Sequence, residues 1–280
     1  MFELTAIDFN RENAAELFVE SLKQTGFGVL KNHPLSQTLV EDLYQNWQHF
    51  FDSNEKFNFE FTQPKQDGFF STHKAETAKG AKYQDLKEYF HYYPWGQCPE
   101  FLREMTQSYY QQANELAETL LSWIETYTPD DVSKHYSQPL SSMIENCENT
   151  LLRILHYPPL KAEQELGAIR AAAHEDINLI TILPAANEAG LQVKTLDGNW
   201  LDVPSDFGYL IINIGDMLQE ASMGYFPSTT HRVINPKGAD KTKSRLSMPL
   251  FLHANPDVKL SERYTAHSYL MERLKELGVL

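Results

Sequence analysis

The stretch HEDINLITIL, residues 174–183, combines possible metal ligands with an apolar run. In extended backbone, side chains two residues apart point to the same face, so His174 and Asp176 share a face while Glu175 points away. The apolar run 179–183 has the length and composition of a short β-strand. We therefore expect a strand-rich region that presents one imidazole and one carboxylate side by side.

Similar short apolar or alternating runs continue on both sides of this stretch, and Pro, Gly, Asn and Asp residues separate them. The predicted strands lie in residues 151–157, 179–183, 191–193, 208–214 and 246–252. Several short strands separated by turn residues are typical of a β-barrel or β-sandwich.

Helices are predicted outside this region. Apolar residues recur at helical spacing over residues 11–24, 36–51 and 100–127, and a last apolar face runs from Leu260 to Leu277. Residues 63–82 have the composition of a loop that could border an active site. No internal repeat or polar linker divides the chain, so we expect one α+β domain over residues 1–280. It would comprise a mainly helical region 1–148, a β core 149–255 and a C-terminal helix 256–280.

The charge and the cysteine content narrow the possible partners and the compartment. A net charge of −14 repels nucleic acid and anionic lipid, so we expect neither as a partner. No stretch approaches the roughly 18 apolar residues that span a bilayer, and the opening residues do not resemble a signal peptide. Cys98 and Cys147 lack the spacing of a metal knuckle and are expected to be buried free thiols. These features predict a cytoplasmic protein.

The His174 and Asp176 pair alone is weak evidence for a metal, because ten histidines and 38 acidic residues give roughly 1.4 such pairs by chance. Support comes from His231, which follows 55 residues after Asp176. Two imidazoles and one carboxylate form a facial ligand set that leaves positions open on Fe(II). The predicted metal ligands are therefore His174, Asp176 and His231.

Arg245 and Ser247 follow shortly after His231 and share a strand face. A guanidinium binds a carboxylate through two parallel hydrogen bonds, and a nearby hydroxyl can add a third. The alternative is a surface salt bridge, which is common in an acidic protein. The proximity of His231 favours a carboxylate-binding pair.

Taken together, four motifs resemble the isopenicillin N synthase-like Fe(II), 2-oxoglutarate-dependent dioxygenases. They are His174-x-Asp176, the run from Asn213 to Gln219, the run from Gly224 to Val233 with His231, and Arg245-x-Ser247. The N-terminal run from Thr25 to His33 also resembles an early strand of that family. The resemblance extends over nearly the whole chain.

This resemblance implies a distorted jelly-roll core, a double-stranded β-helix, with Fe(II) in its mouth. It implies that 2-oxoglutarate and O2 are co-substrates, and that Arg245 and Ser247 hold the far carboxylate of 2-oxoglutarate. Tyr157 would add a hydroxyl to that carboxylate. Leu155 departs from the asparagine that many plant members have two residues before this tyrosine, so one amide contact is missing or comes from elsewhere.

Other readings of the sequence remain open. His156 and His253 are expected to be hydrogen-bonded structural residues rather than ligands. The chain could be an Fe(II) oxidase of the same fold that does not use 2-oxoglutarate, or a catalytically silent metal-binding module. The sequence does not specify the small-molecule substrate, the choice between hydroxylation and desaturation, or the oligomeric state.

Overall fold

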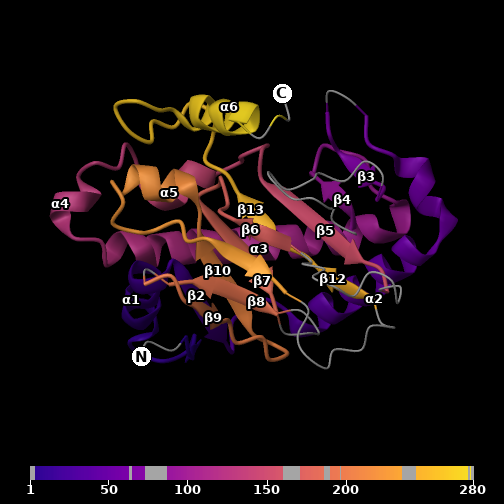
Figure 1. The fold of residues 1–280 in the computed structure, drawn as a ribbon, viewed down its shortest axis with the longest axis horizontal. Coiled ribbons are helices and arrows are strands. Elements are labelled where there is room, and N and C mark those ends of the chain that lie inside the picture. The colour runs from indigo at the N-terminus through magenta and orange to yellow at the C-terminus, as the bar shows by residue number, and fades with distance from the viewer. Residues whose placement is uncertain are drawn as a thin grey trace.

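Two β-sheets form the centre of the molecule. The computed structural model describes residues 4–62, 65–72, 87–159, 171–185, 190–195, 197–234, 244–276 and 278. Within these residues, a nine-stranded major sheet faces a four-stranded minor sheet. This arrangement, with helices around it (Figure 1), agrees with the predicted distorted jelly roll.

The major sheet runs in the order β1-β2-β10-β7-β13-β5-β4-β3, and β12 also pairs with β5. Its strands are β1 (Ala6–Asp8), β2 (Phe27–Lys31), β3 (Gly68–Phe70), β4 (Glu88–Tyr92), β5 (Leu151–Tyr157), β7 (Ile180–Pro184), β10 (Leu210–Ile214), β12 (Arg245–Ser247) and β13 (Leu250–Leu252). The minor sheet runs β6-β11-β8-β9. Its strands are β6 (Ala171–His174), β8 (Leu191–Lys194), β9 (Trp200–Asp202) and β11 (His231–Val233).

Helices flank the sheets, and the sequence supplies a clear cap for two of them, α1 and α2. They are α1 (Ala14–Thr25), α2 (Gln37–Asp52), α3 (Glu100–Thr126), α4 (Asp130–Ser133), α5 (Asp216–Ala221) and α6 (Ala266–Glu276), with 3-10 turns η1 (Asn54–Phe59) and η2 (Leu140–Ile144). Ser36 caps α2 by accepting a hydrogen bond from the backbone N–H of Leu39. Gly26 ends α1 in the left-handed conformation, with φ of 73°.

Strand β5 lies between the helical layer and the space between the two sheets. Leu152 and Ile154 are fully buried in the main hydrophobic core, together with the inward face of α3. Figure 1 shows α3 passing behind the major sheet. The alternate residues of β5, from Leu151 to Tyr157, therefore point away from α3, toward the minor sheet. This inner face carries the functional residues described below.

Several predicted boundaries were wrong. β3 lies inside the segment 63–82 that was predicted as a loop, because its three residues are too short for a periodic signal and depend on pairing with β4. Residues 63–64 and 73–82 of that segment lie outside the described residues. The predicted strand 246–252 is two strands, β12 and β13, separated at Met248 and Pro249.

Both terminal helices also begin later than predicted. α1 begins at Ala14 rather than at residue 11, because residues 9–12 form turns. α6 begins at Ala266, so Leu260 and Tyr264 precede it. The backbone N–H of Leu260 bonds the carbonyl of Tyr264 in a tight turn. No helix among the described residues combines the length and the apolar character needed to cross a membrane.

Candidate active site

Two paired strands of the minor sheet bring three predicted ligands together. His174 ends β6, His231 begins β11, and the two residues are direct partners in the antiparallel pair. Asp176 follows β6 by two residues. The Nε2 atoms of His174 and His231 each lie 3.8 Å from Oδ1 of Asp176, and the three candidate ligand atoms lie within 4.8 Å of one another. They are close enough to bind one metal ion.

Hydrogen bonds orient both imidazoles for this role. Nδ1 of His174 lies 2.7 Å from the carbonyl oxygen of Ala172, and Nδ1 of His231 lies 3.2 Å from that of Thr229. A carbonyl can only accept, so each Nδ1 carries the proton and donates it. Each Nε2 then keeps its lone pair for a metal.

Asp176 is also prepared as a ligand. Its Oδ2 accepts hydrogen bonds from the Thr181 hydroxyl at 2.5 Å and from the Asn213 amide at 2.8 Å. Its Oδ1, which faces the two imidazoles, is left for a metal. Thr181 comes from β7 and Asn213 from β10, so the major sheet positions a ligand of the minor-sheet cluster. The sequence prediction gave neither residue a role, although both interrupt apolar strands with a polar side chain.

The charges of the cluster favour a cation. Burial would raise the pKa of Asp176, but the two imidazoles and the hydrogen bonds from Asn213 and Thr181 outweigh it and lower that pKa. Surrounding protein atoms, and then His231, lower the pKa of His174. The His174 side chain nevertheless remains 47% exposed, against 9% for His231. The site is therefore reachable from one side.

Glu175 points away from the cluster, as predicted. Its carboxylate accepts a hydrogen bond from the hydroxyl of Thr230, the residue before His231. This contact joins the two ligand-bearing segments on the side opposite the metal cluster. Glu175 therefore supports the pairing without taking part in the ligand set.

Arg245, Ser247 and Tyr157 lie together on the inner face of the major sheet. Arg245 pairs with Tyr157, and Ser247 pairs with Leu155. All three predicted co-substrate residues are buried, and the Arg245 guanidinium carbon lies 6.0 Å from the centre of the Tyr157 ring. A buried arginine suits a carboxylate, because burial strengthens the charged hydrogen bonds.

Arg245, Ser247 and Tyr157 lie on the same face of the major sheet as Thr181, which donates a hydrogen bond to Asp176. Thr181, Phe251 and Leu151 stand opposite one another across β7, β13 and β5. Leu151 and Tyr157 are an even number of residues apart on one strand, so they point the same way. The donor set and this wall together fit an Fe(II) ion with a dicarboxylate co-substrate.

His156 and His253 are not part of the ligand set. His156 points to the opposite face of β5, where its Nδ1 lies 2.8 Å from Glu88 and its Nε2 lies 3.2 Å from the Gln48 amide. It is the hydrogen-bonded structural residue that was predicted. His253 was expected to be hydrogen-bonded as well, but its buried Nδ1 has no hydrogen-bond partner among the described residues.

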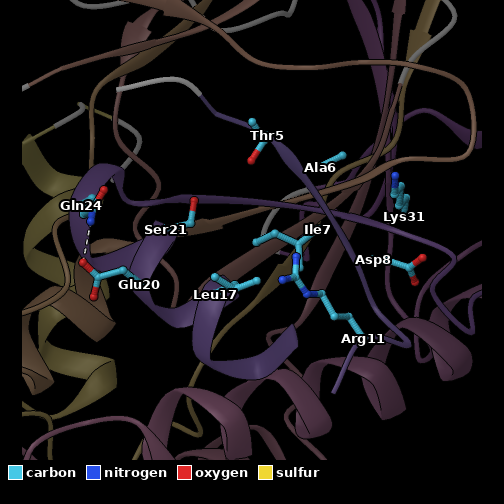
Figure 2. A pocket seen from close by; sticks show the side chains of 10 residues that line it. All are labelled: Thr5, Ala6, Ile7, Asp8, Arg11, Leu17, Glu20, Ser21, Gln24 and Lys31. Atoms are coloured by element: carbon cyan, nitrogen blue, oxygen red, sulfur yellow. Dashed lines mark hydrogen bonds between the residues drawn. The ribbon is translucent and has the colours of Figure 1, made fainter. Parts of the chain in front are cut away.

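A separate surface hollow lies beside α1 and β1, away from the predicted site residues. Its volume is about 420 Å³, and Figure 2 shows its polar lining, including Arg11, Glu20 and Lys31. None of the six predicted site residues lines it. Glu20 bonds Gln24 within the hollow, so part of its polar surface is already satisfied.

Family models of known proteins match both halves of the chain. The model of the 2OG-Fe(II) oxygenase superfamily matches residues 148–254. The model of the non-haem dioxygenase in morphine synthesis N-terminal region matches residues 3–127. The first match contains every residue of the candidate site.

Individual relatives extend this likeness. A 2-oxoglutarate-dependent dioxygenase of Didymella fabae is 30% identical over 275 residues, covering 84% of this chain and 78% of that protein. Gibberellin 2-beta-dioxygenase 2 of Arabidopsis thaliana is 32% identical over 157 residues, covering 55% of this chain. That match covers 44% of the Arabidopsis protein, so it spans less than half the length of that relative.

A solved structure is more similar still. The crystal structure of a proposed oxygenase from Shewanella oneidensis is 62% identical and covers 100% of both chains, with a TM-score of 0.93. The architecture described above is therefore shared from end to end with that bacterial protein.

Proposed function

Because this chain belongs to the 2OG-Fe(II) oxygenase superfamily, we propose that it is a non-haem dioxygenase that hydroxylates or desaturates a small organic molecule. The observation that carries this proposal is the meeting of His174, Asp176 and His231 within 4.8 Å. Their remaining polar atoms are already occupied by hydrogen bonds. The cluster is therefore oriented before any ion binds.

In this proposal, Nε2 of His174, Oδ1 of Asp176 and Nε2 of His231 hold Fe(II). When bound, Fe(II) with O2 and 2-oxoglutarate supplies an oxidant able to cleave a C–H bond, and 2-oxoglutarate becomes succinate and carbon dioxide. The protein orients the reactants and excludes water around them. The buried residues Tyr157, Arg245 and Ser247 on the inner face of the major sheet are suited to excluding water.

Arg245, Ser247 and Tyr157 hold the far carboxylate of 2-oxoglutarate. The Arg245 guanidinium can bind that carboxylate through two hydrogen bonds, and Ser247 can donate a third from two residues along the same face. Leu155 lies opposite Ser247 on β5, two residues before Tyr157, and offers only apolar contact. On this side of the site, the co-substrate would therefore be fixed mainly through its far carboxylate.

The test begins with the purified protein, Fe(II) and 2-oxoglutarate without oxygen. A weak visible charge-transfer band should appear, and admission of air should form succinate. His231→Ala should abolish both the band and succinate formation, because two ligands hold Fe(II) poorly. The matched control is His267→Ala, which removes an exposed imidazole on α6.

Two results would contradict the proposal. Turnover in the His231→Ala variant at the wild-type rate would remove this cluster from the reaction. Oxygen uptake by the wild type without a band and without succinate would indicate an oxidase that does not use 2-oxoglutarate.

We propose further that the enzyme works in the cytoplasm and does not act on nucleic acid. Both described cysteines are buried free thiols, which suits a reducing compartment. The charge of −14 opposes binding to a polyanion.

A further inference from the structure

Arg153 occupies the inner face of the major sheet between the metal cluster and the co-substrate residues. It lies on β5 two residues from Leu151, whose row contains Phe251 and Thr181, and four residues from Tyr157. These separations correspond to roughly 7 Å and roughly 13 Å along a strand. Along β5, Arg153 is therefore nearer to the row that contains Thr181, the hydrogen-bond partner of Asp176, than to Tyr157 at the predicted co-substrate end.

A ring contact and an electrostatic influence also place Arg153 close to the metal side. Its guanidinium carbon lies 5.6 Å from the centre of the Phe251 ring. His253, two residues after Phe251, is influenced by the charges of both Asp176 and Arg153, although burial is the main reason that its pKa falls to about 4. The guanidinium thus reaches the region beside the candidate metal ligands.

His91 fixes one edge of the guanidinium. Nδ1 of His91 lies 3.0 Å from the carbonyl oxygen of Gln66 and must donate to it. Nε2 of the same ring is then an acceptor, and Nε of Arg153 donates to it at 2.9 Å. Burial, followed by the Arg153 charge, holds the pKa of His91 well below its usual range, so the ring stays neutral. This contact uses Nε, and the two terminal nitrogens of Arg153 have no hydrogen-bond partner among the described residues.

Aromatic rings form the surroundings of this guanidinium. The Tyr89 ring centre lies 5.2 Å from the guanidinium carbon, a cation–π distance like that to Phe251. Phe70 stacks on Tyr89 with ring centres 4.6 Å apart, and Phe61 stacks on Phe70 at 4.1 Å. The walls near Arg153 are therefore flat and largely apolar.

The charge of Arg153 has no counter-ion within the part of the chain that the structure describes. Among the described residues, no carboxylate lies within ion-pair distance of it, and its described hydrogen bond is to the neutral His91. By contrast, Arg103, Arg263 and Arg273 pair with glutamates. A chain with 38 acidic and 24 basic residues could readily supply a partner. An oriented, partly buried guanidinium left uncompensated is suited to an anionic ligand.

We propose that Arg153 binds the carboxylate of the primary substrate, and that this substrate is a small carboxylic acid with an aromatic or apolar ring. The two terminal nitrogens would grip the carboxylate, while Tyr89, Phe251 and Phe70 would contact the ring. This inference rests on the proposed dioxygenase function, because it assigns the substrate side of the same site. The site would then hold its reactants at three separate places: the metal ligands, the co-substrate residues and Arg153.

The experiment uses the intact enzyme with Fe(II) and 2-oxoglutarate under anaerobic conditions. The probes are benzoate, phenylacetate, 3-phenylpropionate and cyclohexanecarboxylate, each compared with its primary amide. Calorimetry gives the dissociation constants, and a change in the charge-transfer band reports binding next to the metal. We expect at least one acid to bind more tightly than its amide and to perturb the band.

Arg153→Met is the decisive variant, because methionine keeps an apolar side chain but removes the charge. It should weaken binding of that acid by roughly tenfold or more, with little change for the amide. The 2-oxoglutarate dissociation constant should stay at the wild-type value. Arg263→Met is the matched control, since Arg263 also lies over a tyrosine ring, at 4.6 Å, but on the surface near α6.

Three outcomes would overturn the inference. They are equal binding of acids and amides by the wild type, undiminished acid binding by a folded Arg153→Met variant, and a selective loss of 2-oxoglutarate affinity in that variant. The last result would assign Arg153 to the co-substrate instead. Absence of the charge-transfer band in the wild type would contradict the dioxygenase function itself, and the calorimetric comparison would still test Arg153.

Discussion

Thr181 determines which oxygen of Asp176 is available to a metal. Together with Asn213 it occupies Oδ2, and Oδ1 is left beside the two imidazoles. Such outer contacts fix the orientation of a ligand, and their loss commonly lowers metal affinity by roughly 10- to 100-fold. Two polar side chains on apolar strands thus prepare the ligand set.

Thr181→Val should weaken Fe(II) binding by roughly tenfold, because valine has nearly the same shape but no hydroxyl. Anaerobic titration against a competing chelator would measure this change. Thr181→Ser keeps the hydroxyl and should bind Fe(II) nearly as the wild type does. Equal affinity in the valine and serine variants would show that this hydrogen bond does not orient the carboxylate.

Arg245→Met should raise the KM for 2-oxoglutarate by roughly tenfold or more, because a charge-assisted two-point contact is lost. Fe(II) affinity without co-substrate should not change, since Arg245 stands on β12 and the ligands stand elsewhere. Steady-state kinetics at saturating Fe(II) would measure the effect. An unchanged KM, with normal folding, would return Arg245 to a structural role.

Residue patterns in the sequence predicted some of this site and missed the rest. His174, Asp176 and His231 were predictable because their types and spacing are visible in the chain. The geometry adds what spacing cannot show, such as the contact of Asp176 with Asn213, 37 residues away. Arg153 is equally visible in the sequence, but that no described carboxylate pairs with it emerges only when distant residues are placed in space.

At the level of secondary-structure elements, the residue that ends α1 packs closely against the segment that leads into β11. Gly26, after α1, has φ of 73°, and a Cβ atom there would lie 2.4 Å from Oγ1 of Thr229 and 2.5 Å from the carbonyl oxygen of Pro227. Thr229 also accepts the Nδ1–H of His231 through its carbonyl. The end of a helix therefore supports the entry to a ligand-bearing strand.

Gly26→Ala should destabilise the fold by about 2 kcal/mol or more, because it combines backbone strain with a steric clash. Gly198→Ala is the matched control: φ there is 86°, but no atom lies within 4 Å of the added methyl group. It should cost only the strain, about 1–2 kcal/mol. Urea unfolding of both variants would compare them, and an equal loss would contradict the close packing at Gly26.

Element predictions succeeded where local patterning is strong. α2 and β5 match their predicted spans closely because caps and alternation mark them in the sequence. β3 escaped prediction since it exists only through its pairing with β4. Pro249, which interrupts the predicted strand 246–252, accepts a backbone hydrogen bond from Arg153 across the sheet. Such long-range partners are not encoded in local periodicity.

At the scale of the whole molecule, buried neutral histidines should make stability depend on pH. Burial lowers the pKa of His253 from 6.5 to about 4 and lowers that of His91 well below its usual range. Between about pH 6.5 and pH 4, the unfolded chain binds a proton at His253 that the folded chain does not. Stability should therefore fall as pH falls through this window, by at most about 1.4 kcal/mol per pH unit for each such group.

Urea unfolding of the metal-free protein at several pH values would measure this slope. His253→Leu should reduce the slope between about pH 6 and pH 5, because the variant has no proton to bind at that position. His267→Leu, on the exposed face of α6, should keep the wild-type slope. Identical slopes in all three proteins would contradict a depressed pKa at His253.

The two sheets meet through Asp176, which follows the minor-sheet strand β6 but receives its hydrogen bonds from β7 and β10 of the major sheet. An ion held by His174, Asp176 and His231 would add a second connection at this junction. Fe(II) at about 100 times its dissociation constant should stabilise the folded protein by about 2.7 kcal/mol, and a chelator should reverse the gain. A thermal melt unaffected by Fe(II) in the wild type would contradict this linkage.

Stabilisation of that junction by a metal also has a consequence for the lifetime of the polypeptide in a cell. Proteases cleave chains that open transiently, and the rate of cleavage often follows the population of the open form. Newly made protein should therefore persist when iron is plentiful and be degraded sooner during iron starvation. The amount of enzyme would then follow the nutrient on which its chemistry depends, without any dedicated regulator.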